Sequence, residues 1–413
     1  MTADQDWPNV GVRHLEVEGF RSARHTMFSP RRLCALVGEA RAGKSTLLEA
    51  IRAVLDPEAA PLQPEDVSSG ATRITIRAEL TTGATLTVEG PPTRAKGPGA
   101  PPVVFLPAAE RAGRVVAASS VAAPVIDMFK RVLEKTGNDA AADSTTSPAL
   151  GLVEALEQCC ITDVSGTVLL IEEPELYLRP QAQRYLYRLL RQLAFNGNQV
   201  IYSTHSPAFL NVARLEELGF VTRGPAGSEV VHAEPTTAQE EFKAMSEFDA
   251  ERSELFLAQA AILVEGTTEK LALPFVFQAL GYDADRNGIT IVECGGKAGI
   301  PFFARICKTV GVPFLALHDR DAPQGSQPIA AERRLNQLIA ELTGPKQAIV
   351  LVPDFEAVAG IKGHAHKPLR AWRRFTSLTV DDIPEPLLRT VERSLALAQG
   401  GQREGLAMSE PIP

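Results

Sequence analysis

The sequence is poor in cysteine and lacks long apolar runs, and both absences limit what the protein can be. The polar, acidic start MTADQDWPNV lacks the pattern of a signal peptide, and no stretch is long and apolar enough to cross a bilayer. We therefore expect no membrane association. The cysteines show neither a metal-binding spacing nor an even disulfide framework, which indicates reduced thiols in a cytoplasmic protein. They are Cys34, Cys159, Cys160, Cys294 and Cys307.

A basic balance is also missing. The formal net charge is −8, with 42 Lys and Arg against 50 Asp and Glu. This charge argues against a broad electrostatic coat for nucleic acid, although a local basic patch remains compatible with it. The length of 413 residues exceeds one typical domain, and a hydrophobic content of 45% is enough for packed cores. Two domains are therefore the expectation.

A phosphate-binding loop is the first motif along the chain. GEARAGKS matches G-x-x-x-x-G-K-S, follows the apolar run CALVG and precedes the helical pattern STLLEAIRAVL. Glycines allow backbone N–H groups to surround phosphates, the lysine reaches the outer phosphates, and the serine hydroxyl binds magnesium. The sequence therefore predicts a site for ATP with Mg²⁺ at Gly38, Gly43, Lys44, Ser45 and Thr46.

Two later stretches fit the same site. VLLIEEPE reads as a buried strand that ends in two acids, and NQVIYSTHSP as a strand that ends in a turn. We expect Glu172 to lie near the magnesium and Glu173 to polarise the attacking water. His205, in the turn, is placed to contact a terminal phosphate.

The second half of the chain contains two pairs of acids at predicted strand ends. AAILVEGTTE ends in Glu265 and Glu269, and PFLALHDRD ends in Asp319 and Asp321. Because open parallel sheets present functional residues beyond the carboxyl ends of their strands, neighbouring strands would bring these four carboxylates together. Such a cluster needs a cation, and divalent metal suits carboxylate oxygens. The alternative is that they are ordinary solvated acids in turns.

From residue 261 onward the pattern alternates between strand and helix, as AILVEG, TEKLALPFVFQALG, ITIVEC, KAGIPFFARICKTVG, PFLALHDRD, PIAAERRLNQLIAELTG and QAIVLV. This alternation predicts an α/β domain with a parallel sheet covered by helices on both faces. Gly295, Gly296 and Lys297 form a predicted turn after ITIVEC. Either a backbone approach to substrate or a plain strand–helix turn explains them.

The first half resembles the ABC-type ATPase heads of the RecF, SMC and OLD (overcoming lysogenisation defect) group. The resemblance depends on the FRS opening, GEARAGKS, VLLIEEPE and STHSP. It implies ATP bound between two heads of a homodimer. The chain departs from the family in having no clear LSGGQ-like signature, and in Ala40-Arg41-Ala42 within the loop. The resemblance therefore implies ATP binding more directly than fast hydrolysis.

The second half resembles the TOPRIM domain of OLD nucleases, through LVEGTTE and HDRD. On that resemblance, Glu356 in VPDFEAVAG is a further metal-binding carboxylate, and Lys367 faces the scissile phosphate. The resemblance also implies two Mg²⁺ or Mn²⁺ ions. The ligands would be Glu265 and Asp319 for one ion, and Glu269, Asp321 and Glu356 for the other, while Ser45 and Glu172 would serve the nucleotide's Mg²⁺.

These observations predict an ATPase domain at residues 1–225, a connector at 226–257, a TOPRIM domain at 258–376 and a tail at 377–413. The leading hypothesis is an ATP-gated, metal-dependent DNA endonuclease, linked by resemblance to antiphage defence and to a partner protein in such a system. A nucleotide-switched DNA-binding sensor or repair ATPase with an inactive TOPRIM centre is the alternative. A topoisomerase or primase subunit is a third, without a recognisable nucleophilic-tyrosine domain or zinc-binding segment.

Overall fold

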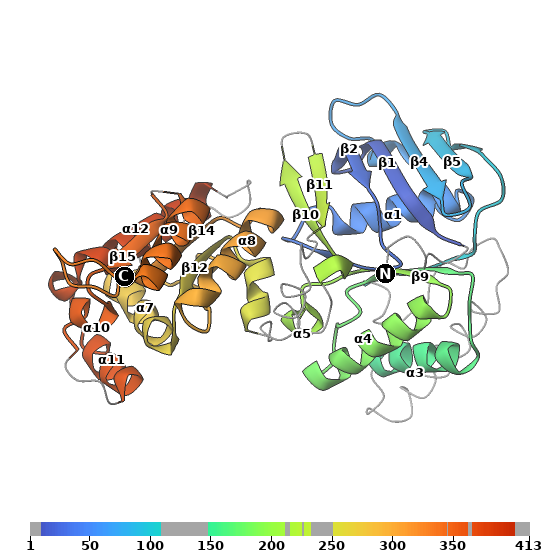
Figure 1. Cartoon of the computed structure of the whole chain (residues 1–413). Coiled ribbons are helices and arrows are strands. Elements are labelled where there is room, and N and C mark those ends of the chain that lie inside the picture. Colours follow the sequence, from blue (N-terminus) through green and yellow to red (C-terminus); the bar gives the residue numbers. More distant parts are fainter. Residues whose placement is uncertain are drawn as a thin grey trace. The chain divides into compact units, whose positions relative to one another are not determined.

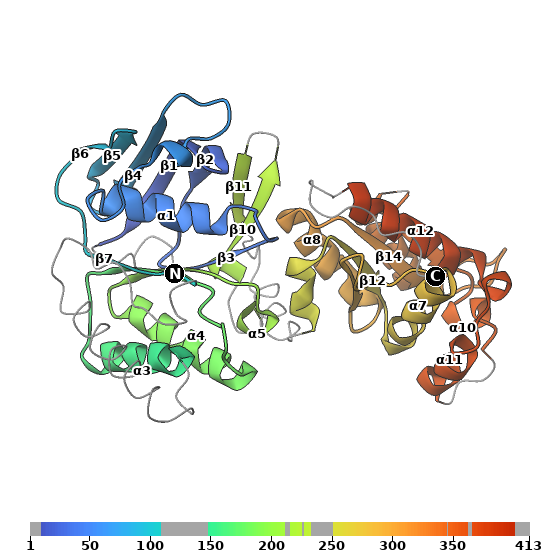
Figure 2. The same ribbon diagram turned by 180° about the vertical axis from the view of Figure 1, so that it is seen from behind.

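The structure is a computed structural model with two compact units, Met1–Ser246 and Glu247–Pro413, which are described one at a time (Figures 1 and 2). It describes residues 10–108, 148–210, 215–224, 227–232, 251–344, 346–361 and 366–400. In these ranges, no helix has both the length and the apolar character needed to cross a membrane.

The first unit contains an antiparallel sheet of five strands. Its order is β2 (Ala23–Phe28), β1 (Val12–Phe20), β4 (Ile74–Leu80), β5 (Thr85–Gly90) and β6 (Arg94–Lys96). Along β1, Leu15 and Val17 are fully buried, while the alternating Glu16 and Glu18 are more exposed. This period of two places one face of the sheet against the core and leaves the other polar.

A second sheet of six strands carries the nucleotide motifs. Its order is β11 (Gly227–His232), β10 (Leu218–Gly224), β3 (Leu33–Val37), β9 (Gln199–Ser203), β8 (Val168–Glu172) and β7 (Val103–Leu106). All neighbours are parallel except β10 and β11. Every residue of β3 and β9 is buried, as expected for central strands covered on both faces.

Helices cover both faces of this second sheet. Helix α1 (Lys44–Leu55) contacts β1, β4 and β5 of the first sheet and also β7, β8 and β9 of the second. It therefore forms the layer between the two sheets. Helix α4 (Pro180–Phe195) packs on β9 and β3 and also contacts α3 (Pro148–Ile161). The first unit is thus a layered α/β structure, and the strand, loop and helix expected around GEARAGKS are all present.

The hairpin of β10 and β11 extends the sheet into residues 227–232, which the sequence assigns to the connector. The backbone N–H of Ser228 donates to Ser22 O at 3.1 Å, and Thr26 Oγ1 donates to Ser228 O at 2.6 Å. Ser228 Oγ donates in turn to Ala42 O, within the phosphate loop, at 2.7 Å. These bonds fix the hairpin to the first unit and to the nucleotide motif.

The second unit has a four-stranded parallel sheet, in the order β13 (Ile289–Glu293), β12 (Ala260–Val264), β14 (Phe314–Asp319) and β15 (Ala348–Leu351). One face packs on α7 (Thr267–Ala279) and α12 (Glu385–Gly400), and the other on α8 (Ile300–Val310) and α9 (Ala330–Thr343). The predicted α/β class and the doubly covered parallel sheet are confirmed.

Three features complete the second unit. Two short helices, α10 (Phe355–Val358) and α11 (Lys367–Phe375), follow β15, and α11 packs against α7. Helix α12 falls inside the 377–413 stretch that the sequence describes only as a tail. It buries Leu387 and Val391 completely in the same core as Ile262 of β12, so this segment belongs to the fold of the unit.

Candidate nucleotide site and carboxylate centre

Two glycines allow the phosphate loop to pass close to β10 and β11. A Cβ at Gly38 would lie 2.1 Å from Val221 O, and a Cβ at Gly43 would lie 2.1 Å from Ser228 Oγ. Gly43 also has φ 113° and immediately precedes α1. The loop therefore passes close to β10 and β11, and α1 begins directly after it, where helix N-terminal N–H groups can stabilise a phosphate.

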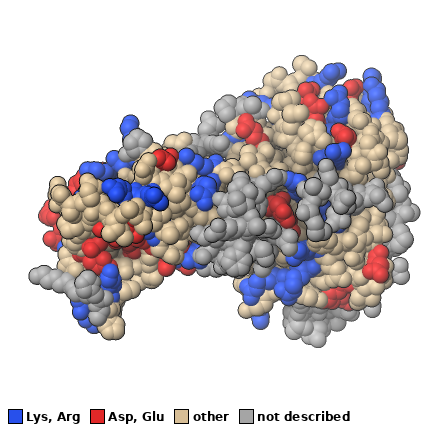
Figure 3. All heavy atoms as spheres, viewed as in Figure 1, with Lys and Arg blue, Asp and Glu red and all other residues tan. Residues whose placement is uncertain are grey.

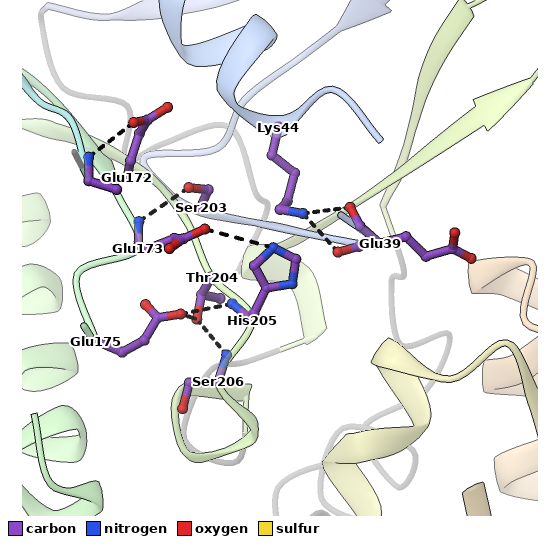
Figure 4. Close-up of polar contacts among 11 residues, drawn as sticks. Glu39, Lys44, Glu172, Glu173, Glu175, Ser203, Thr204, His205 and Ser206 are labelled. Carbon is purple, nitrogen blue, oxygen red and sulfur yellow. Dashed lines mark hydrogen bonds and ion pairs between the residues drawn. The ribbon is translucent and has the colours of Figure 1, made fainter. Parts of the chain in front are cut away.

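Lys44 is buried within this loop (Figure 4). Its Nζ donates to Gly38 O at 2.8 Å and to Glu39 O at 2.7 Å. Burial lowers the pKa of Lys44 to about 8, against the opposing effect of Glu173 and Glu175. The ammonium is therefore largely charged at neutral pH and is held inside the loop, where it can exchange carbonyl partners for phosphate oxygens.

The two hydroxyls that follow Lys44 differ in their surroundings. Ser45 is exposed, as a residue that offers its hydroxyl to magnesium must be. Thr46 is 8% exposed, and its Oγ1 accepts a hydrogen bond from Ser22 Oγ at 3.0 Å. Thr46 thus holds the FRS segment against α1. Its contact with the nucleotide stays a prediction.

Two acids stand at the end of β8, which β9 separates from β3 in the sheet. Glu172 Oε2 accepts from the backbone N–H of Ala108 at 3.0 Å. Glu173 has φ 42°, and its N–H donates to Ser203 O at 3.0 Å. Its Oε1 lies 3.9 Å from His205 Nε2 (Figure 4). Burial and the charge of Lys44 lower the pKa of His205, so the imidazole is neutral and this contact is weaker than an ion pair.

Glu175 is a member of this site that sequence reasoning did not assign. Its Oε1 accepts from Thr204 Oγ1 and from the backbone N–H of His205, both at 2.8 Å (Figure 4). Burial raises the pKa of Glu175, and its Oε2 is buried without a hydrogen-bond partner among the described residues. Glu175 therefore fixes the turn that carries His205. In the sequence, only its place as the third acid of EEPE indicated that Glu175 could belong to the site.

The carboxylate centre of the second unit is built at the adjacent ends of β12 and β14. These strands pair directly, so Glu265, which follows β12, and Asp319, which ends β14, lie close together. The backbone N–H of Asp319 donates to Glu265 Oε1 at 2.7 Å, and Asp319 Oδ1 accepts from the N–H of Phe355 at 2.8 Å. Phe355 begins α10, the helix that also carries Glu356. The predicted convergence of the two acidic strand ends is present.

Three of these acids lie together: Glu269 is buried, and Glu265 and Asp319 are partly buried. Burial, with repulsion from the neighbouring acids, raises the pKa of Glu265 to about 7 and that of Asp319 to about 8. Glu269, in the first turn of α7, is 6% exposed, and burial together with Asp319 and Glu356 raises its pKa to about 7. The close packing of these acids and the raised pKa values favour a carboxylate cluster over ordinary solvated acids in turns.

Two lysines pair with the remaining acids. Lys297 Nζ lies 2.5 Å from Asp321 Oδ2 and 3.1 Å from Glu332 Oε2. Lys367 Nζ lies 2.9 Å from Glu356 Oε1, and this hydrogen bond raises the pKa of Lys367. Sequence reasoning assigned neither Lys297 nor Glu332 to the centre. In the sequence, only the Gly-Gly-Lys turn indicated that Lys297 could lie at the centre, and a plain strand–helix turn explained that motif equally well.

The donor set suits a hard divalent cation, since every candidate ligand is a carboxylate oxygen. Across the described ranges, however, no three His, Cys, Asp or Glu side chains are arranged to hold a metal ion together. The hydrogen bonds and ion pairs above explain why, because Glu265, Asp319, Asp321 and Glu356 are each directed at a different donor. Figure 3 shows acidic side chains gathered over the region of β15.

Two protein-family models match the chain. The "Overcoming lysogenization defect protein-like, TOPRIM domain" model matches residues 256–321. The "AAA domain, putative AbiEii toxin, Type IV TA system" model matches residues 150–211. These stretches include β8 with its acids in the first unit, and Glu265, Glu269, Asp319 and Asp321 in the second. The resemblance drawn from the motifs is therefore confirmed.

Two curated nucleases and one solved structure are similar to parts of the chain. An OLD nuclease of Thermus scotoductus is 37% identical over 264 residues, which are 59% of this chain and 49% of the relative. The Old nuclease of Escherichia phage P2 is 29% identical over 164 residues, 38% of this chain and 28% of the relative. The SMC head domain from Thermotoga maritima is 17% identical with a TM-score of 0.35, and covers 54% of this chain and 99% of that domain. The chain thus matches about half or less of the length of the two nucleases.

Proposed function

We propose that this chain, a relative of the OLD nucleases with an OLD-like TOPRIM domain, is an ATP-binding, divalent-metal-dependent DNA endonuclease. The observation that carries the proposal is the group of Glu265, Glu269 and Asp319, of which Glu269 is buried and the other two are partly buried. Holding three acids close together with little solvent is costly, and their raised pKa values are typical of a centre suited to binding cations.

Each residue of the centre has a proposed role. Glu265 and Asp319 would hold one Mg²⁺ or Mn²⁺, and Glu269, Asp321 and Glu356 another. Two such ions supply an activated water and charge stabilisation for phosphodiester cleavage. Lys367 already lies against Glu356 and would offset negative charge on the scissile phosphate. Helix α11, which begins at Lys367, also carries exposed Arg370 and Arg373, and these fit a polyanionic substrate.

The first unit would bind ATP through the loop from Gly38 to Ser45. Lys44 would contact the outer phosphates, Ser45 and Glu172 would hold the nucleotide's Mg²⁺, and Glu173 would orient the attacking water. His205, neutral and 3.9 Å from Glu173, would contact the terminal phosphate. The resemblance of the GEARAGKS, VLLIEEPE and STHSP motifs to ABC-type heads is the basis for proposing a homodimer formed through the heads, by which ATP would gate the nuclease.

The proposal extends to the cellular setting. DNA is the proposed substrate, phage defence or DNA processing in the cytoplasm is the proposed role, and a partner protein in a defence system is a proposed associate. These points depend on the relationship to OLD nucleases and on the motifs, and each is open to experiment.

Cleavage of supercoiled plasmid tests the proposal directly. The protein would be assayed with Mg²⁺, Mn²⁺ or EDTA, with and without ATP, beside Asp319→Ala and the exposed control Asp381→Ala. We expect metal-dependent nicking or linearisation in the parent protein and in Asp381→Ala, and a loss of at least about 100-fold in Asp319→Ala. Retained cleavage in Asp319→Ala would overturn the proposed centre. An absence of cleavage with ATP still bound would favour a nucleotide-switched sensor.

A further inference from the structure

Lys297 is a buried ammonium at the edge of the carboxylate centre. Its side chain is 6% exposed, and it reaches the centre from the short turn Lys297–Gly299 that follows β13. The pairing with Asp321 is close, 2.5 Å between Nζ and Oδ2. One of the proposed metal ligands is therefore already joined to a positive charge that the protein itself supplies.

The same lysine has a second acid within reach. Glu332, in the first turn of α9, lies 3.1 Å from Nζ through Oε2. Its side chain is 28% exposed, compared with 41% for Asp321. An ammonium has three donors and no directional fork, so Lys297 can strengthen one contact as it weakens the other. If Lys297 moves away from Asp321, it therefore stays paired with Glu332.

Among the described residues, the other acids of the centre are not paired with a buried cation in this way. Glu265 and Asp319 accept hydrogen bonds from backbone N–H groups of Asp319 and Phe355, which are neutral donors. Glu356 pairs with Lys367, whose side chain is 39% exposed and can move into solvent. Asp321 is thus the acid held by the least exposed cation. A divalent ion that binds through Asp321 has to share it with Lys297 or displace Lys297 from it.

We propose that Lys297 competes with a divalent cation for Asp321, and that Glu332 is the alternative acceptor that makes the exchange favourable. The centre would then have two unequal cation sites. The site at Glu265 and Asp319 would fill first, and the site that uses Asp321 would fill only as Lys297 transfers to Glu332. This inference depends on the proposed function, since it concerns the same carboxylate centre.

Two substitutions at this lysine pair should have opposite effects. Lys297→Gln removes the competing charge, so the weaker cation site should bind more tightly, by about tenfold. Glu332→Gln removes the alternative acceptor, so Lys297 should stay on Asp321 and the weaker site should bind less tightly by a similar factor. Tenfold is the low end of what one unit charge at this distance does to proton affinity. A purely structural role for the pair would weaken binding in both variants.

The measurement is Mn²⁺ binding followed by electron paramagnetic resonance at about pH 8, without nucleotide. Ions that disappear in Asp319→Asn or in Asp321→Asn are assigned to the centre, which separates them from any ion at the nucleotide site. Lys308→Gln, an exposed lysine of α8, and Glu341→Gln, an exposed acid of α9, are matched controls. The double variant Lys297→Gln/Asp321→Asn should show no gain, since the gain acts through Asp321.

The outcomes distinguish the inference from the proposed function. Opposite shifts in Lys297→Gln and Glu332→Gln, with unchanged controls, would support the competition. Shifts in the same direction, or no shift, with normal Mn²⁺ binding by the parent protein would overturn the competition and leave the nuclease proposal standing. A parent protein whose Mn²⁺ binding is the same as that of Asp319→Asn would overturn the cation centre and the competition together.

Discussion

Individual side chains decide the properties of the carboxylate centre, and their charge states depend on pH. The folded protein raises the pKa of Glu265 and Glu269 to about 7 and of Asp319 to about 8. The unfolded chain would release these protons near the ordinary values of 4.5 and 3.8. The folded state therefore binds more protons than the unfolded state between these limits, and its stability falls as the pH rises through 7 to 8.

We predict that the protein in EDTA loses thermal stability between about pH 6.5 and about pH 8.5. The window begins at pH 6.5 because His205, His232 and His318 have lowered pKa values and change charge below it. Thermal unfolding monitored by circular dichroism gives the measurement, with Asp319→Asn as the comparison. That variant should show a shallower fall, and an equally steep fall in it would exclude this carboxyl as a source of the effect.

A second residue-scale prediction concerns Glu173. Glu173→Gln should keep ATP affinity, because Lys44 and the glycine loop are unchanged, and should reduce ATP hydrolysis by about 100-fold or more, the usual contribution of a residue in this role. Filter binding and phosphate release measure the two properties. Lys44→Ala should lose affinity itself. Equal hydrolysis in Glu173→Gln and the parent protein would remove Glu173 from the proposed role.

The sequence indicated which residues within recognisable motifs lie near one another. It gave no indication of contacts between residues outside such motifs, in elements that are distant in the sequence. The proximity of Glu265 and Asp319 could be predicted because Glu265 directly follows β12, Asp319 ends β14, and the two strands are neighbours. Lys297 and Glu332 could not be predicted to meet, since they lie in different elements and only the packing of α9 beside the turn joins them.

Among the elements, buried parallel strands were the most predictable. β12 and β14 are continuous apolar runs because helices cover both faces of their sheet. Such runs, with helical stretches between them, are compatible with few folds other than a parallel α/β sheet. The β10–β11 hairpin was missed because β11 is partly exposed, and its Ser, Glu and His resemble a polar connector. Helix α12 has no motif, only an apolar stripe that meets the sheet.

Helix α12 offers an element-scale prediction. Leu387 is fully buried against the sheet, so Leu387→Ala should lower the free energy of unfolding of the second unit by about 2–5 kcal/mol. The neighbouring Leu388 is only partly buried, and Leu388→Ala should cost clearly less. Urea unfolding of the full chain gives both values. Equal costs would show that α12 is not fixed on the sheet in solution.

At the level of the whole molecule, the question is whether two copies associate when ATP binds. The resemblance to ABC-type heads implies that they do, and Glu173→Gln should hold the ATP-bound state. We predict that this variant sediments as a dimer with Mg²⁺ and ATP and as a smaller species without nucleotide. Lys44→Ala should sediment identically under both conditions. A Glu173→Gln protein that sediments alike with and without ATP would contradict dimerisation through the heads.

The hydrogen bonds of Ser228 have a consequence for communication along the chain. Its hydroxyl is joined to Ala42 inside the phosphate loop, and its own strand, β11, ends at His232, after which the chain leads to the second unit at Glu247. A change in the path of the loop at Ala42 would therefore act on β11 through this bond. Ser228→Ala removes the bond, so it would show whether β11 contributes to the position of the phosphate loop and to nucleotide affinity.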